Sequence, residues 1–450
     1  MSDRVAVVGG GIAGLATAFH LARAGADPVV FERDDVPGGI VAPPIEVGDL
    51  WLEPGPDSLA ARKAWGADLC RRLGLTLIAP GASGAFLWTD AGLVPYLSGT
   101  AFGIPGDVGD VLRWAGLSRR GRVRALADLV KRKRRDGADE TLGELLRRRL
   151  GDEATDLAIA PLLAGLHAGD VDRLSTSATF PELLAWERTQ GSLIRGAQAA
   201  QRSARGGQPG PLFVRPSGGM RELVDALADA LGDRVRTGAE VMHVGDREVQ
   251  LVGGAEPVDA VVLACGAYPA AEVLEHAAPT ELSSIRSVST GVVFLVYPFG
   301  TADALPDGTG FVVPRGKAPM TAATFVSRKW PDERFGDRAI VRCYVGGAGD
   351  EDVLDAPDED IVEACARHLS AVLDLPEPSA SRVHRWWRAM PQYEIGHLGR
   401  VQRIREALPP GIFLVGSAFD GVGVSDLARA AEQTAALVLE SAGAPRKEPA

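Results

Sequence analysis

Cysteine and histidine are scarce in this sequence, and they are not arranged as metal ligands. The 450 residues include four cysteines and seven histidines, with no C-x-x-C pair and no histidine at ligand spacing beside a cysteine. Zinc sites and small disulfide frameworks depend on such arrangements. The sequence therefore predicts no metal ligands, and it predicts free core thiols at Cys70, Cys265, Cys343 and Cys365.

The chain also lacks an apolar run of about 18 residues, the length that a membrane-spanning helix needs. A strand pattern begins within a few residues of Met1, which leaves no room for a signal peptide. The formal net charge is -11, and an acidic chain without a reader motif is not expected to bind DNA or RNA. These absences predict a cytoplasmic protein with no nucleic-acid partner.

Glycine is abundant instead, and it punctuates a strand-turn-helix pattern near the N-terminus. An apolar strand at 5–8 is followed by Gly9-x-Gly11-x-x-Gly14 and an amphipathic helix. Such glycines allow a tight turn and the close approach of a pyrophosphate to the positive end of the helix. The alternative is a βαβ unit whose glycines only make a turn. Glu32 argues against that alternative, because an acid about 20 residues further on binds a ribose 2′-hydroxyl and disfavours NADP.

A second Gly-rich strand-turn-helix pattern lies at 412–439, near the other end of the chain. It contains Gly416 and the sequence Gly421-Val422-Gly423, and a long helix follows from about Ser425. A chain of 450 residues exceeds the size of one core, so two or three domains are expected. Together, the two Gly-rich patterns predict one domain, built from both ends of the chain, that binds a flavin.

The segment 112–150 is predicted to be helical and basic. Ser118 is expected to cap one helix and Thr141 to open a capping box for the next. Val123, Leu126, Leu129 and Val130 are expected to form a buried apolar stripe. The cluster at 131–135 has two interpretations, a solvated helix end or a patch for anionic lipid, and the first is favoured.

Several motifs spread over nearly the whole chain resemble the bacterial coproporphyrinogen III oxidase and protoporphyrinogen oxidase family, FAD enzymes of haem biosynthesis in the flavin amine oxidase superfamily. The motifs are Gly9 to Gly14, Gly38-Gly39, Glu53 to Ser58 with Arg62-Lys63, Gly165 to Asp170, Thr179 to Pro181, Gly191 to Leu193, Gly218 to Met220, Met390 to Tyr393 with Gly396-His397, and Asp420 to Gly423.

The resemblance implies an α/β fold, α+β overall. It has a Rossmann-like FAD-binding domain of the p-hydroxybenzoate hydroxylase type, a substrate domain with a mixed sheet, and a helical domain. The expected boundaries are 1–60, 203–266 and 396–445 for the FAD-binding domain, 61–80, 178–202 and 267–395 for the substrate domain, and 81–177 for the helical domain, which could touch a membrane. The residues expected to hold FAD are Gly9, Gly10, Gly11, Ile12, Ala13, Gly14, Glu32, Arg33, Gly38, Gly39, Gly55, Pro56, Asp57, Ser58, Val241, Gly416, Gly421, Val422, Gly423 and Val424.

The resemblance further implies that coproporphyrinogen III is oxidised to coproporphyrin III. Hydride would pass from a bridge carbon to flavin N5, three flavin cycles would remove six electrons, and dioxygen would become hydrogen peroxide. No catalytic side chain is obligatory in this scheme. The chain is expected to be a monomer or homodimer, with product hand-over to a ferrochelatase as a possible partnership.

The propionate arms of such a substrate need cations, and Lys63 is nominated first, with Arg62 beside it and Arg385 or Arg388 after them. The alternative for Lys63 is an ordinary surface lysine, and the two interpretations are about even. His167 is nominated as a pocket residue, although a structural role is favoured, because a lone histidine in a helical domain is more often structural.

Three alternative functions remain open at this point. Protoporphyrinogen IX could be the substrate, but coproporphyrinogen III is preferred because the Arg-, Gly- and Ala-rich composition is typical of high-GC Gram-positive bacteria. A divergent paralogue of the flavin amine oxidase superfamily, acting on another substrate, is the second alternative, because His167, the stretch after Gly39 and the loop after Gly423 depart from the family's usual pattern. An amine oxidase proper is disfavoured, because the segment 283–299 lacks the lysine that amine oxidases place there. A non-catalytic FAD-fold binding protein is the third alternative.

Overall fold

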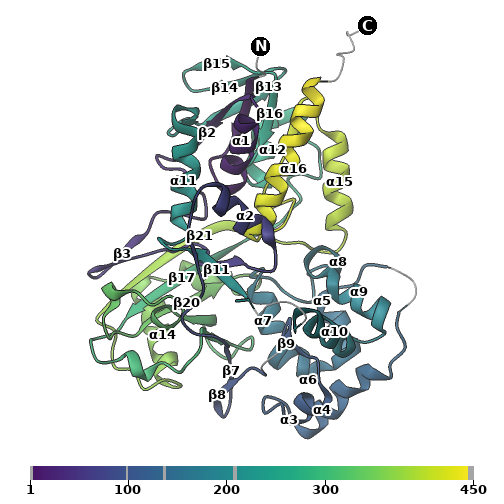
Figure 1. Ribbon diagram of the computed structural model, residues 1–450, viewed down its shortest axis with the longest axis vertical. Coiled ribbons are helices and arrows are strands. Elements are labelled where there is room, and N and C mark those ends of the chain that lie inside the picture. The colour runs from purple at the N-terminus through teal and green to yellow at the C-terminus, as the bar shows by residue number, and fades with distance from the viewer. Residues whose placement is uncertain (1–3, 98–99, 135–137, 206–209, 444–450) are drawn as a thin grey trace.

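A five-stranded parallel sheet forms the centre of the upper lobe in Figure 1, in a computed structural model that describes residues 4–97, 100–134, 138–205 and 210–443. Its central strands are almost wholly buried Val and Ala runs, as expected for a parallel sheet covered on both faces. The strands, in spatial order, are β12 (Val235–Arg236), β2 (Asp27–Phe31), β1 (Arg4–Val8), β16 (Ala260–Leu263) and β22 (Ile412–Leu414).

Different elements cover the two faces of this sheet. One face carries the helices α1 (Ile12–Arg23), α2 (Ala64–Arg72), α11 (Arg221–Leu231) and α16 (Val424–Gly443). The other face carries the β-meander β13 (Val241–Gly245), β14 (Glu248–Leu251) and β15 (Gly254–Pro257), with α12 (Ala267–Leu274) and α15 (His397–Ala407). Helix α1 packs directly against α16, so the two ends of the chain share one lobe, as predicted.

A mixed seven-stranded sheet forms the second lobe, at the lower left of Figure 1. Its strands are β21 (Ala380–Pro391), β17 (Ser287–Val296), β20 (Ile340–Gly346), β19 (Met320–Phe325), β18 (Gly310–Val312), β7 (Phe86–Thr89) and β8 (Gly92–Pro95). Helix α14 (Asp358–Ser370) packs on one face, and the hairpin β3 (Ile45–Val47) to β4 (Leu50–Leu52) packs on the other.

Short helices form the third lobe, at the lower right of Figure 1. They enclose a Leu-rich core and comprise α3 (Val108–Arg113), α4 (Arg119–Leu126), α5 (Leu142–Leu150), α6 (Asp152–Ala154), a π-helical turn (Thr155–Ile159), α7 (Ala160–Gly165), α8 (Thr176–Thr179), α9 (Pro181–Gln190) and α10 (Leu193–Arg205). The predicted caps are confirmed: Ser118 accepts the N–H of Gly121, and Thr141 forms a capping box with Glu144.

Three further pairings between short strands complete the fold. Strand β11 (Phe213–Pro216) makes two of them, with β5 (Leu59–Ala60) and β6 (Leu77–Ile78), while the third, between β9 (Thr100–Ala101) and β10 (Ile104–Pro105), is a hairpin that packs into the helical lobe. The architecture is thus the predicted α/β fold with a second, mixed sheet and a helical lobe.

Some expectations of local structure were wrong. The predicted stripe is incomplete: Val123, within α4, is 67% exposed, and Val130, beyond the end of α4 at Leu126 and the 3-10 turn that follows, is 83% exposed. The loop expected from Ser203 starts later, because α10 continues to Arg205; the part at 206–209 lies outside the described residues.

Four segments lie in other lobes than the domain prediction put them. Helix α2, within 61–80, packs into the core of the parallel sheet, and the hairpin β3 to β4, within 1–60, packs against the seven-stranded sheet. Strands β7 and β8, within 81–177, belong to the seven-stranded sheet, because β7 pairs with β18. Helices α9 and α10, which cover most of 178–202, pack into the helical core. The other domain boundaries remain predictions.

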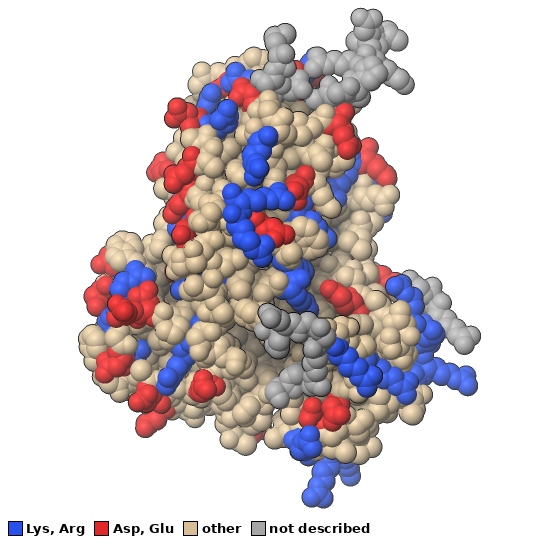
Figure 2. Space-filling view, viewed as in Figure 1, with Lys and Arg blue, Asp and Glu red and all other residues tan. Residues whose placement is uncertain are grey.

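Basic side chains gather on the helical lobe, at the lower right of Figure 2. Within the cluster 131–135, the ammonium groups of Lys131 and Lys133 donate to the carbonyls of Arg148 and Arg188, at 2.7 and 3.0 Å, near the C-terminal ends of α5 and α9. That is the favourable end of a helix for a cation. These contacts agree with the interpretation as a solvated helix end; Arg135 lies outside the described residues.

Burial of the cysteines follows the prediction in most positions. All four are free thiols; Cys70, Cys343 and Cys365 are buried, and Cys265 is partly exposed. In the described part of the chain, no helix combines the length and apolar character needed to cross a membrane.

Candidate functional site

The first Gly-rich turn joins β1 to α1 and leaves a cradle beside its backbone. Gly9 has a φ of +109°, a conformation that favours glycine. A Cβ at Gly14 would lie 2.0 Å from the carbonyl oxygen of Gly9, so only glycine lets the helix pack this close to the strand. A Cβ at Gly11 would meet nothing within 4 Å. The turn therefore offers open space at the N-terminus of α1, where a pyrophosphate can approach.

Glu32 lies at the end of β2, directly beside this turn. Its carboxylate accepts the N–H groups of Gly10, at 2.7 Å, and of Asp34, at 3.0 Å. The N–H of Gly38 donates to the carbonyl of Gly10, at 2.8 Å, so the second pair of predicted glycines lies against the first turn. Arg33 points outward and pairs with Asp34 on the surface.

Val241 lies at the same edge of the parallel sheet. The N–H of Ala239, two residues earlier, donates to the carbonyl of Glu32 at 2.8 Å. Val241 itself begins β13 and is buried against the meander. The chain thus brings together the Gly9 turn, Glu32, Gly38 and the approach to Val241, although these are far apart in the sequence.

The segment 53–58 is held by two cations of the second lobe, one at the end of the short helix α13 (Val326–Lys329) and one in β20. Lys329 pairs with the carboxylate of Asp57 at 2.8 Å, and Arg342 donates to the carbonyl of Gly55 at 2.8 Å. Burial alone would raise the pKa of Asp57, but the charges of Lys329 and Arg342 outweigh it and hold that pKa well below its usual range. A Cβ at Gly55 would lie 2.0 Å from the carbonyl oxygen of Ile40, which makes this approach specific to glycine.

The last Gly-rich turn joins β22 to α16. The N–H of Gly416 donates to the carboxylate of Asp420 at 3.0 Å, and Gly421 has a φ of +122°. Within the described residues, the N–H groups of Val422, Gly423 and Val424 donate no hydrogen bond. Unpaired N–H groups at the start of a helix, with the helix dipole behind them, suit an electron-rich or negatively charged group.

Lys63 and Arg62 point to different partners. Lys63 donates to Asp426, in the first turn of α16, at 2.6 Å, and its side chain remains about one third exposed. The guanidinium of Arg62 lies over the ring of Phe102, in the helical lobe, at 4.4 Å from the ring centroid. Of the two, only Lys63 reaches the Gly421 turn.

His167 is buried at the junction of the lobes. Its ring lies 5.6 Å from that of Phe180 and 5.8 Å from that of Tyr393, centroid to centroid. Burial, and to a lesser degree the charge of Lys63, lowers the pKa of His167 to about 4, so the imidazole is neutral at pH 7. Its Nδ1 atom has no hydrogen-bond partner among the described residues.

The two weaker nominations lie elsewhere. Arg385 donates to the carbonyls of Leu354 and Ala356, both at 2.8 Å, and to the carboxylate of Asp358, so its guanidinium holds the start of α14 in place. Arg388 is exposed, with a φ of +47°. Neither contacts the elements that surround the Gly421 turn.

Sequence reasoning missed four side chains of this region: Lys329, Arg342, Tyr393 and Asp426. The first two follow no motif: Lys329 ends the short helix α13 (Val326–Lys329) and Arg342 lies in β20, and the sequence does not specify how these elements face the segment 53–58. Tyr393 belongs to a recognised motif but was given no role. Asp426 lies three residues past Gly423, at the start of the predicted helix, and its side chain was given no role.

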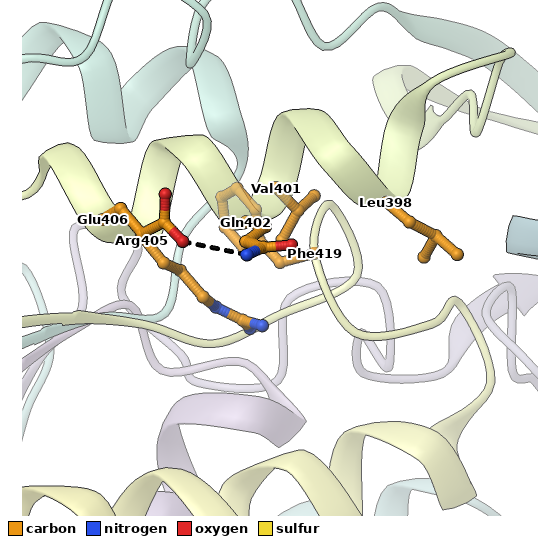
Figure 3. A pocket seen from close by; sticks show the side chains of 6 residues that line it. All are labelled: Leu398, Val401, Gln402, Arg405, Glu406 and Phe419. Carbon is orange, nitrogen blue, oxygen red and sulfur yellow. Dashed lines mark hydrogen bonds between the residues drawn. The ribbon is translucent and has the colours of Figure 1, made fainter.

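A groove of about 350 Å³ lies on the outer face of α15 and holds none of these residues. Figure 3 shows Gln402 bonded to Glu406 along its wall. The groove is lined by Leu398, Val401, Gln402, Arg405, Glu406 and Phe419.

Comparison with known proteins identifies relatives along nearly the whole chain. Residues 12–439 match the family described as flavin containing amine oxidoreductase. A coproporphyrinogen III oxidase of Bacillus subtilis is 33% identical over 453 residues, covering 95% of this chain and 96% of the relative.

Solved structures of other proteins are similar to this chain along nearly its whole length. A candidate protoporphyrinogen oxidase from Exiguobacterium superposes with a TM-score of 0.86, at 32% identity, over 98% of this chain and 99% of that one. A putrescine oxidase superposes with a TM-score of 0.73 over 98% of this chain and 99% of the other, at 19% identity, which indicates a shared fold.

Proposed function

This chain belongs to the flavin containing amine oxidoreductases and, among them, to the family of the bacterial coproporphyrinogen III oxidases, and from that membership we propose that it oxidises coproporphyrinogen III to coproporphyrin III in haem biosynthesis. The observation that carries the proposal is the 33% identity to the Bacillus subtilis enzyme over 95% of this chain. The geometry supports it, because a cation and the open N–H groups of the Gly421 turn meet at the junction of the lobes.

The flavin is proposed to be FAD. Gly9, Gly11 and Gly14 would admit the pyrophosphate at the start of α1, and Glu32, at the end of β2, would accept a ribose hydroxyl with the lone pairs that its two N–H contacts leave free. At the other end, the first turn of α16 would direct its N–H groups at the ring.

The proposed overall reaction removes six electrons and six protons from the macrocycle. Bound FAD would supply the hydride acceptor and return the electrons to dioxygen, so that three molecules of dioxygen become three of hydrogen peroxide. The protein itself binds and orients the macrocycle and keeps bulk water out of the junction between the lobes.

The propionate arms are proposed to meet Lys63 first. Lys63 is partly exposed and already orders one carboxylate, that of Asp426, so a second carboxylate can approach the same ammonium group. Arg62 would contribute from the side of the helical lobe. His167, neutral at pH 7, would contribute shape and a hydrogen-bonding nitrogen but no charge.

Protoporphyrinogen IX is the second candidate substrate, favoured by the similarity to the Exiguobacterium protein. The two substrates differ at two positions, where propionates replace vinyl groups. An additional cation that touches the macrocycle would therefore favour coproporphyrinogen III.

The test is to mix the purified, flavin-loaded protein with freshly reduced coproporphyrinogen III without air and to follow bleaching of the flavin absorbance. Air is then admitted, and porphyrin fluorescence and hydrogen peroxide are recorded, with protoporphyrinogen IX in a parallel sample. Rapid bleaching with preference for coproporphyrinogen III, and three peroxides per porphyrin, are expected. A flavin that stays oxidised with both substrates would refute the proposal and favour a divergent paralogue or a non-catalytic binding protein.

A further inference from the structure

Tyr393 holds the turn that leads into α16 from both sides. It follows β21 by two residues and is 3% exposed. Its hydroxyl donates to the carbonyl of Ser417 and accepts the N–H of Gly421, at 2.8 Å. Burial raises the pKa of Tyr393, so the hydroxyl keeps its proton and can donate. One atom thus closes the ends of the turn 417–421.

The other lobes fix the position of Tyr393 itself. Its carbonyl accepts the N–H of Ser175 at 2.8 Å, and the side-chain amide of the preceding Gln392 donates to the carbonyl of His167 at 3.0 Å. Its ring stacks on that of His397, the first residue of α15, with the centroids 4.0 Å apart and the planes at 12°. The hydroxyl therefore transmits a position set by the helical lobe and α15.

The turn that Tyr393 closes determines where α16 begins. Gly421 has a positive φ, and its N–H is used by Tyr393, so the next N–H groups, from Val422 to Val424, are the ones left for a ligand. Glycine allows many backbone conformations, so the turn does not by itself fix the direction of these N–H groups. The hydrogen bond from Gly421 to the hydroxyl of Tyr393 is directional and restricts that direction.

We propose that Tyr393 is a positioning residue: by bonding to both Ser417 and Gly421, it directs the open N–H groups of Val422, Gly423 and Val424 toward the flavin ring. For the flavin itself the inference needs only that FAD binds. For the rate of porphyrinogen oxidation it rests on the proposed function.

The test compares Y393F with a matched control, Y96F. Tyr96 is partly buried and donates one hydrogen bond, at 2.6 Å, to the carbonyl of Ala158 in the helical lobe. Both variants lose a hydroxyl that donates to a backbone carbonyl. Y393F is expected to shift the flavin absorption spectrum, to weaken reconstitution with FAD by about 3- to 10-fold, and to slow anaerobic bleaching by a similar factor at unchanged KM. Y96F is expected to lower thermal stability without these changes.

A Y393F protein with the spectrum, FAD affinity and bleaching rate of the parent would overturn the inference, and so would equal flavin effects in Y96F. Should Y393F fail to fold, H397L decides, because it removes the stacked ring while keeping the hydroxyl. H397L is expected to shift the flavin spectrum in the same direction, and no shift would count against the inference. If the parent protein oxidises no porphyrinogen, the proposed function fails, while spectrum and FAD affinity still test Tyr393.

Discussion

The buried ion pair between Arg149 and Asp128 should be the most costly polar contact to remove from the helical lobe. Both side chains are fully buried. The guanidinium of Arg149 also donates to the carbonyls of Asp128 and Gly191, at 2.7 and 2.6 Å, and Asp128 accepts from Ser192 and from the N–H of Ile194. The pair therefore connects the segment after α4 with α5 and the start of α10.

Replacing Arg149 with Met leaves the carboxylate of Asp128 buried with its neutral donors alone. Breaking a buried pair in this way costs about 3–5 kcal/mol of the free energy of unfolding. For a lobe of about 100 residues, that corresponds to a fall in Tm of roughly 12–40 °C. The double variant R149M/D128N removes the uncompensated charge and keeps an acceptor for Ser192, so it should recover at least about 1 kcal/mol.

Calorimetric melting of the flavin-loaded protein measures both effects. R147M is the matched control, because Arg147 lies on the same helix but pairs with Asp156 and Asp172 at the surface, where such pairs contribute about 1 kcal/mol or less. If R149M melted no lower than R147M, or if the double variant melted no higher than R149M, the reasoning from burial would be refuted.

Three further predictions concern the site. K63A should lower kcat/KM for coproporphyrinogen III by about 3- to 30-fold through loss of a charged contact to propionate. R72A, at the far end of the helix α2 that Lys63 precedes, should leave kcat/KM unchanged, and equal effects would remove Lys63 from the site. G14A should lose FAD, measured as flavin absorbance per protein, because a Cβ there meets a backbone oxygen at 2.0 Å, while G165A, with open space around it, should retain FAD. Burial lowers the pKa of His397 to about 4 in the folded protein, below the value of about 6.5 in the unfolded chain. As the pH drops from 6.5 toward 4, the imidazole therefore takes up a proton in the unfolded chain before it does so in the folded protein, and the free energy of unfolding falls. H397F should reduce this loss of the free energy of unfolding between pH 6.5 and 4 by up to about 3 kcal/mol, as measured by urea unfolding at each pH. An unchanged pH dependence in H397F would contradict the lowered pKa.

The sequence predicted local structure correctly where a particular backbone conformation or cap can be formed by only one or a few residue types. Gly9 and Gly14 predicted a turn that only glycine permits, and Thr141 predicted a capping box three residues wide. Such a local pattern failed at Val130, because the helix that the predicted stripe assumed ends at Leu126. A periodicity predicts a face only for as long as the helix continues.

The motif around Gly191 to Leu193 shows what a resemblance alone leaves unexplained. In the structure its serine donates to Asp128, and the carbonyl of Gly191 accepts from Arg149, so its role here is to complete a buried charge network. The run Arg147 to Arg149 lies in the segment 112–150, which the sequence predicted only to be helical and basic. Burial of Arg149 depends on which helices surround it, and no local pattern contains that information.

By itself, then, the sequence determined the elements whose signals lie within about 20 residues: the glycine turns, the acid that ends β2, the helix caps and the alternation of buried strands. Only the tertiary structure decided which side chains share a site. Lys63 meets Asp426 across 363 positions, and Lys329 meets Asp57 across 272. The physical reason is that such contacts follow from strand order and lobe packing, which sum many weak apolar contacts over the whole chain, whereas turns and caps are decided by a few atoms close together in sequence.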